Sequence, residues 1–136
     1  SRIGSEKIKD YFITGVLDSK SKIEYAGIIS TPMLYYSTKD KFDVGVIATA
    51  SHNPKEFTGF KICGKDGIPL SPEKDIKPSF KEYKMPNVIY DSKHFRKDFG
   101  KDYIDFYVDK FKDLTYKKGI VVDFSNGATV FEKKII

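Results

Sequence analysis

The sequence predicts an α/β fold in which a mixed, mostly parallel sheet packs between helices. Two observations favour this fold. Short apolar runs typical of buried strands alternate with segments of helical periodicity, and polar loops follow the strands. The chain has 136 residues, which suits one domain of ordinary size. With 40% hydrophobic and 32% charged residues, its composition is that of a globular protein, not a disordered one.

The first elements alternate between helix and strand. Apolar residues at helical spacing predict a helix over 5–17, with Ser5 as its N-cap. Alternating apolar and polar residues then predict a strand over 23–29. Thr31 is the expected N-cap of a short helix that reaches about Lys39, because a proline follows it at the first helical position.

The middle of the chain contains two strands and one strong helix. The apolar run over 44–48 predicts a buried strand, and the polar loop 49–58 separates it from a second strand over 59–63. Asp66-Gly67 is a hairpin turn signal after that strand. An aromatic stripe at helical spacing makes 99–114 the best amphipathic helix, and its spacing favours packing over a base-stacking surface.

The end of the chain changes pattern again. The apolar run over 119–124 predicts a buried strand, and an Asn-Gly loop follows it at 125–128. A strand with such a loop after it typically opens a βα unit. The sequence stops at Ile136, where the next helix should form, so we interpret it as a fragment.

Charge and cysteine content exclude several classes of protein. The net charge is +5, but lysines and acidic residues are interspersed, which indicates a solvated surface and not a nucleic-acid-binding face. No apolar run reaches the length of about 18 residues that a transmembrane helix needs. The single Cys63 fits a reducing cytoplasm and excludes a multi-cysteine zinc site.

The loop after the 44–48 run contains the residue types that phosphoryl chemistry uses. Ser51 is a potential nucleophile or phosphate carrier at a strand end, where ligands collect in α/β sheets. His52 can move a proton, and Lys61 on the returning strand can place an ammonium near a phosphate. The same polar residues, with Asn53 and Pro54, also form ordinary turns, so these residues alone leave both interpretations open.

A longer match supports the functional interpretation. Ala-Thr-Ala-Ser-His-Asn-Pro at 48–54, followed by Gly-Phe-Lys at 59–61, resembles the active-site serine loop of the α-D-phosphohexomutase superfamily. That superfamily includes phosphomannomutases and phosphoglucomutases. Thr-Pro at 31–32, the hairpin at 66–71 and the strand and loop at 120–127 resemble its flanking elements in the same order.

The resemblance implies a mechanism and a set of site residues. Ser51 would carry the phosphoryl group as phosphoserine and exchange it with a hexose monophosphate through a hexose bisphosphate. His52 and Lys61 would assist proton transfer and steady the phosphate, and Thr49 and Asn53 would contact the substrate or its phosphate. Mg²⁺ would be bound by an oxygen of the Ser51 phosphate and by an aspartate-rich loop that this sequence does not contain. Cationic groups that offset charge on the moving phosphoryl group suit this chemistry.

The resemblance also implies a division of the chain. Residues 1–98 would form domain I without its first strand, 99–118 a linking helix, and 119–136 the opening strand of a similar domain II. The partners would be hexose phosphates and the remaining domains of the parent chain, in the cytoplasm, with no nucleic acid and no membrane. The fragment alone would be inactive. One alternative is a non-catalytic sugar-phosphate-binding or regulatory protein on the same fold, and another is a small basic nucleic-acid-binding module.

Overall fold

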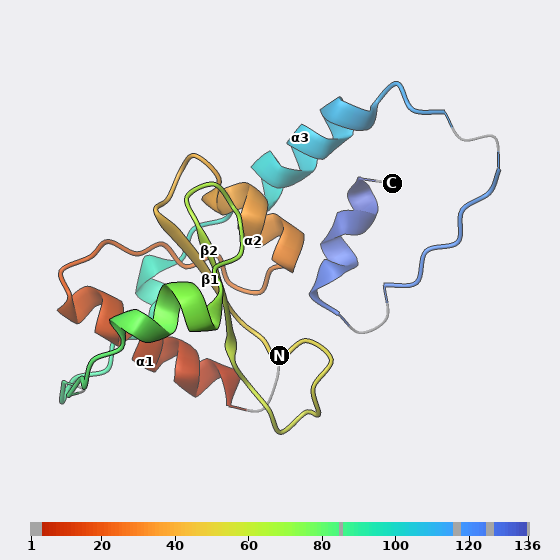
Figure 1. The fold of residues 1–136 in the computed structure, drawn as a ribbon. Helices are drawn as coiled ribbons and strands as arrows, with labels where there is room; N and C mark the ends of the chain where they lie inside the picture. Colours follow the sequence, from red (N-terminus) through yellow and green to blue (C-terminus); the bar gives the residue numbers. More distant parts are fainter. Residues whose placement is uncertain (1–3, 85, 116–117, 125–126, 136) are drawn as a thin grey trace.

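The computed structural model describes residues 4–84, 86–115, 118–124 and 127–135. Within these ranges, two strands and three α-helices form the main elements, joined by short helical turns (Figure 1). Their bounds are α1 Ser5–Asp18, α2 Thr31–Thr38, β1 Val44–Ala48, β2 Phe60–Gly64 and α3 Gly100–Phe111. The short turns are η1 Pro72–Ile76, η2 Lys77–Ser79, η3 Ser92–Phe95 and η4 Ala128–Lys134.

The sheet of the described residues has two antiparallel strands, β1 and β2. Their register runs from Val44 opposite Gly64 to Ala48 opposite Phe60. The expected mostly parallel sheet is therefore not confirmed in this part of the chain. The physical reason is local: the loop after β1 returns the chain directly beside it, whereas a parallel pair needs a long crossover connection.

Helices α1 and α2 cover opposite faces of this sheet (Figure 1). Because side chains alternate along a strand, Phe60 and Cys63 point to different faces. The ring of Phe60 lies 5.1 Å from that of Phe12 in α1. On the other face, a Cβ added to Gly45 would overlap Thr38 Oγ1 of α2. The described elements thus form a helix–sheet–helix arrangement.

The predicted strand over 23–29 is wrong as a regular strand. Its only pairing among the described residues is an isolated parallel bridge between Tyr25 and Arg96. The extended backbone is also interrupted at Gly27, where φ is 82°. A strand needs a hydrogen-bonded neighbour along its length, and periodicity alone does not supply one.

The predicted strand over 119–124 is not confirmed either. These residues have no regular structure, and Val121 is 97% exposed. The loop predicted after them falls partly at 125–126, outside the described residues. The chain then forms η4, a 3₁₀ helix in place of a completed βα unit.

Two predicted helix caps are off by one residue. Ser5 lies within α1, and the N-cap is Gly4, whose φ is 82°. The N-cap of α2 is Ser30 in place of Thr31, since the Ser30 hydroxyl accepts a hydrogen bond of 3.2 Å from Met33 N–H. Serine and threonine are both good N-cap residues, so the sequence alone does not choose between neighbours.

The core lies between α2, β2 and α3. Its buried members are Ile29, Met33, Leu34, Cys63, Phe99 and Tyr103. The aromatic stripe of α3 packs on α2, with ring centroids 5.4 Å apart for Tyr36 and Tyr103 and 5.0 Å apart for Tyr36 and Phe106. The predicted packing role of the stripe is confirmed. Among the described residues, no helix is long and apolar enough to span a membrane.

Candidate active site

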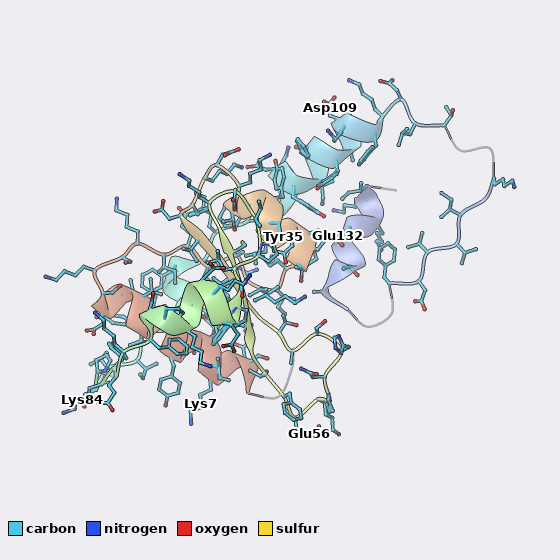
Figure 2. The ribbon with its side chains drawn as sticks, in the orientation of Figure 1. Lys7, Tyr35, Glu56, Lys84, Asp109 and Glu132 are labelled. Carbon is cyan, nitrogen blue, oxygen red and sulfur yellow. The ribbon has the colours of Figure 1, made fainter. Side chains whose placement is uncertain are left out.

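The candidate site is the loop between β1 and β2, drawn in yellow in Figure 1. Its base is closed by a backbone hydrogen bond of 2.8 Å from Thr49 N–H to Gly59 O, which continues the ladder by one pair. Figure 2 shows Glu56 at the far end of the loop from the two strands. The loop is thus anchored at its strand ends and reaches into solvent beyond them.

Ser51 lies near the start of this loop in a left-handed backbone conformation, with φ of 51°. Its N–H donates a hydrogen bond of 3.2 Å to Thr49 Oγ1, and Ser51 itself is exposed. Asn53 N–H donates to Ala50 O at 3.0 Å, which closes a turn around Ser51. This conformation is rare for residues other than glycine, asparagine and aspartate, and such backbone outliers cluster at functional sites.

Lys61 and Thr49 lie on the same face of the β1–β2 pair. Lys61 pairs with Ile47, and Thr49 is two residues further along the same strand. Residues at this diagonal position have Cβ atoms about 7–8 Å apart, within reach of a long side chain. The register therefore brings the predicted lysine to the serine end of the hairpin.

The remaining predicted residues lie on the exposed turn. His52 and Asn53 are both exposed, and the backbone of Asn53 is used in the turn. Their side chains make no hydrogen bond or ion pair with another residue in the described part of the chain. A hydrogen bond thus connects Thr49 to Ser51, and Thr49 lies on the same face of the sheet as Lys61. His52 and Asn53 lie near Ser51 because they follow it directly in the sequence.

One contact at this site has no counterpart in the predictions from the sequence. Ser5 Oγ of α1 lies 3.5 Å from Thr58 Oγ1, at the end of the loop that leads into β2. The contact joins residues 53 positions apart, so no local pattern in the sequence signals it. The contact connects the end of the loop that leads into β2 to the start of α1.

The described residues do not by themselves form a metal site. They contain no group of three or more histidine, cysteine, aspartate or glutamate side chains placed to hold a metal ion. A serine phosphate at Ser51 would offer one oxygen ligand from an exposed position. The other ligands of a magnesium ion would have to come from elsewhere.

A cleft of about 1910 Å³ begins beside the loop and runs along β1. Thr49, Asn53 and Lys55 line its end near the loop. The other walls come from α1, from the segment 21–29 and from α2. The candidate site is therefore continuous with a large groove.

Comparisons with known proteins agree with this geometry. The model of the phosphoglucomutase/phosphomannomutase α/β/α domain I matches residues 1–86, more than half of the chain. A phosphomannomutase of Methanocaldococcus jannaschii is 47% identical over 141 aligned residues, covering 99% of this chain and 31% of that protein. Phosphoglucosamine mutases of Methanococcus aeolicus and Caldicellulosiruptor bescii are each 30% identical, covering 94% of this chain and 29% and 30% of those proteins.

The chain thus spans about a third of the length of these curated relatives. The match includes the serine loop, both strands of the hairpin and helices α1 and α2, all of which lie within residues 1–86. The α/β/α description of the matched domain also fits helices on both faces of the sheet. The chain belongs to the phosphoglucomutase/phosphomannomutase family, and its residues 1–86 match domain I of that family.

Proposed function

We propose that this chain is the phosphoserine-bearing part of a hexose-phosphate mutase, with Ser51 as the phosphoryl carrier. The observation that supports this most is the backbone of Ser51. An exposed serine in a left-handed conformation, held by the Thr49 hydroxyl directly after β1, presents its side chain at a strand end. Lys61 lies on the face that Thr49 shares.

In the proposed reaction, a phosphoryl group moves from Ser51 to a hydroxyl of the sugar. The bond between phosphorus and Ser51 Oγ breaks while a bond forms from phosphorus to a sugar hydroxyl oxygen, and the hydroxyl proton leaves to a base. His52 is the proposed base, and the Lys61 ammonium offsets charge on the moving group. The resulting hexose bisphosphate turns round and returns its other phosphoryl group to Ser51. Thr49 and Asn53 are proposed to contact the phosphate during both transfers.

Magnesium enters this proposal only as an ion bound to an oxygen of the Ser51 phosphate. It would supply positive charge next to the transferred group. Because the described residues offer no acidic cluster, we assign no step to it within this chain.

The proposed substrates are hexose 1- and 6-phosphates, since the relatives are named for mannose and glucosamine phosphates. We retain the proposed division into domain I at 1–98, a linking helix at 99–118 and the start of domain II at 119–136. The fragment alone would not convert hexose phosphates, because the groups that bind the metal and the sugar would belong to other domains. The cytoplasm is the proposed compartment, where the free thiol of Cys63 is stable.

The test is phosphorylation and turnover in the parent protein. After incubation with glucose 1,6-bisphosphate, the intact mass should rise by about 80 Da, the mass of one phosphoryl group, and peptide mapping should place it on Ser51. Ser51→Ala should abolish both the mass increase and mutase turnover of mannose 1-phosphate. Ser21→Ala, at an exposed serine outside the loop, should retain both. Binding of sugar phosphate with no phosphorylation and no turnover would favour the non-catalytic alternative.

A further inference from the structure

Helix α1 contacts the end of the serine loop that leads into β2. The ring of Phe12 in α1 lies 5.1 Å from the ring of Phe60, the first residue of β2, and the two ring planes are inclined by 41°. Aromatic pairs at this separation attract each other beyond the burial of their surfaces. Phe60 is 40% exposed, so this contact lies at the margin of the hairpin and not in its core.

A second contact from α1 reaches the same part of the chain, residues 58–60, which we call the return segment. Ser5 Oγ lies 3.5 Å from Thr58 Oγ1. Ser5 is the first residue of α1, and Phe12 follows it by seven residues, which is about two turns of the helix. Residues at this spacing lie on one face of a helix. One face of α1 therefore contacts the return segment on both sides of Gly59.

Gly59 connects the return segment to the serine. Its carbonyl oxygen accepts a hydrogen bond of 2.8 Å from Thr49 N–H. The Thr49 hydroxyl oxygen in turn accepts a hydrogen bond of 3.2 Å from Ser51 N–H. The backbone of Ser51 is thus linked by two successive hydrogen bonds to the segment that α1 contacts.

Lys61 follows Phe60 directly and points to the other face of the sheet. Successive side chains of a strand alternate between faces, so a ring held against α1 at position 60 directs the side chain at position 61 away from α1. Lys61 pairs with Ile47, which places it on the face of Thr49. A rotation of the strand that released Phe60 from α1 would therefore also move Lys61.

We propose that Phe12 is a positioning residue for the phosphoryl transfer proposed at Ser51. Its ring holds Phe60 against α1 and so keeps the Lys61 ammonium on the face of Thr49, at the serine end of the hairpin. This inference rests on the function proposed above and adds to it a residue of α1, outside the loop. Phe12 does not touch the reacting atoms, because it acts through Phe60 and Lys61.

Loss of the ring contact should affect the transfer step more than substrate binding. An ammonium that offsets charge on a moving phosphoryl group acts most strongly in the transition state, so its displacement lowers kcat more than it raises KM. A displacement of about 1 Å can cost roughly 100-fold in rate. Phe12→Leu keeps an apolar side chain but removes the ring, so it should lower kcat by roughly tenfold or more and leave KM nearly unchanged.

The test measures conversion of mannose 1-phosphate by the full-length parent protein after incubation with glucose 1,6-bisphosphate. Phe12→Tyr is the conservative variant, which should retain kcat. It keeps the ring, and because Phe12 is only half-buried the added hydroxyl can reach water. Ile13→Val is the matched control, since Ile13 is the neighbouring residue of α1 and is 3% exposed. It should lower the melting temperature without lowering kcat, with all assays made well below the melting temperature of the least stable variant.

A double variant separates positioning from a general loss of stability. Lys61→Ala alone should lower kcat, because it removes the ammonium. If Phe12 acts through Lys61, the addition of Phe12→Leu to Lys61→Ala should lower kcat no further. The melting temperature should instead fall by about the sum of the two single effects, since a purely structural loss does not depend on the ammonium.

The outcomes distinguish this inference from the function on which it rests. An unchanged kcat in Phe12→Leu, in a parent protein that converts the substrate, would overturn the positioning role and leave the proposed function intact. The same conclusion would follow from an equal loss of kcat in Ile13→Val, or from losses that multiply in the double variant. A parent protein that takes up no phosphoryl group on Ser51 would overturn the proposed function and this inference together.

Discussion

The Tyr103 hydroxyl donates a hydrogen bond of 2.9 Å to Glu132 Oε1, which joins α3 to η4. Ser30 Oγ donates to the same carboxylate oxygen, so the N-cap of α2 also takes part. Figure 2 shows Glu132 on η4, beside α2. Burial, followed by the bond to Glu132, raises the pKa of Tyr103 above its ordinary value of 10.0. One carboxylate therefore holds three elements together.

Tyr103→Phe should lower the free energy of unfolding by about 1 kcal/mol, the usual contribution of one hydrogen bond. Tyr107→Phe is the matched control, because Tyr107 belongs to the same aromatic cluster and makes no side-chain hydrogen bond within the described residues. Urea unfolding at pH 7 measures both variants. Equal losses in the two variants would contradict the role of the Glu132 bond.

The same substitution should change the response to alkali. The folded state holds the Tyr103 proton more tightly than the unfolded state does, since the folded pKa lies above 10.0. Stability is then fully present below pH 10 and falls as the pH rises toward the folded pKa. Tyr103→Phe should show a smaller fall above pH 10 than the unmodified chain. A fall of the same size would show that other groups dominate the alkaline response.

Gly45→Ala should be severely destabilising, by about 2–3 kcal/mol or more, because overpacking a tight core displaces its neighbours. The added Cβ would overlap Thr38 Oγ1 and lie 2.8 Å from Cys63 Sγ. Gly119→Ala is the control, since no other atom in the part of the chain that the structure describes lies within 4 Å of its added Cβ. Thermal unfolding of both variants gives the comparison. A Gly45→Ala chain as stable as Gly119→Ala would exclude the close approach of α2 to β1.

Ser51→Gly should be more stable than Ser51→Ala by about 1 kcal/mol, because glycine adopts positive φ without a Cβ penalty. The φ of 51° at Ser51 is the basis for this difference. At Ser21, which has no positive φ, the same pair of substitutions should favour alanine or leave stability unchanged. Chemical denaturation of all four chains distinguishes the two sites. Identical behaviour at both would mean that Ser51 leaves this conformation in solution.

Ser30→Ala and Ser37→Ala should differ in their effect on the free energy of unfolding, although both serines are buried. Ser30→Ala removes an N-cap and a bond to Glu132, so it should cost about 1–2 kcal/mol. Ser37→Ala removes a hydroxyl without a partner in the described part of the chain, so stability should stay within about 0.5 kcal/mol or rise. Urea unfolding curves of the two variants and of the unmodified chain measure both effects. A large loss in Ser37→Ala would reveal a partner for its hydroxyl.

Elements fixed by local pattern were predicted well from the sequence. The apolar run over 44–48 coincides with β1, and the aromatic stripe predicted within 99–114 lies on α3. In both cases the information is carried by neighbouring residues: apolar side chains in a run, or at helical spacing. The closeness of Ser51 and His52 in the serine loop is also local, because the two residues are adjacent in the sequence.

Features that depend on a distant partner were not predictable in this way. The segments 23–29 and 119–124 have strand-like composition, but among the described residues neither has a neighbouring strand along its length. The alignment of Thr49 with Lys61 depends on the register of β1 and β2, which a shift of one residue would reverse. Sequence reasoning could name candidate residues but not the face of the sheet that Thr49 and Lys61 share.

Cys63 has a practical consequence. It is the only cysteine of the sequence, and it is fully buried in the core, directly opposite Gly45 in the β1–β2 pair. A thiol reagent can therefore label the native chain only when the sheet separates from α2, since thiolate attack requires access. The labelling rate of the unmodified protein then reports how often α2 separates from the hairpin that carries the serine loop, with no engineered probe.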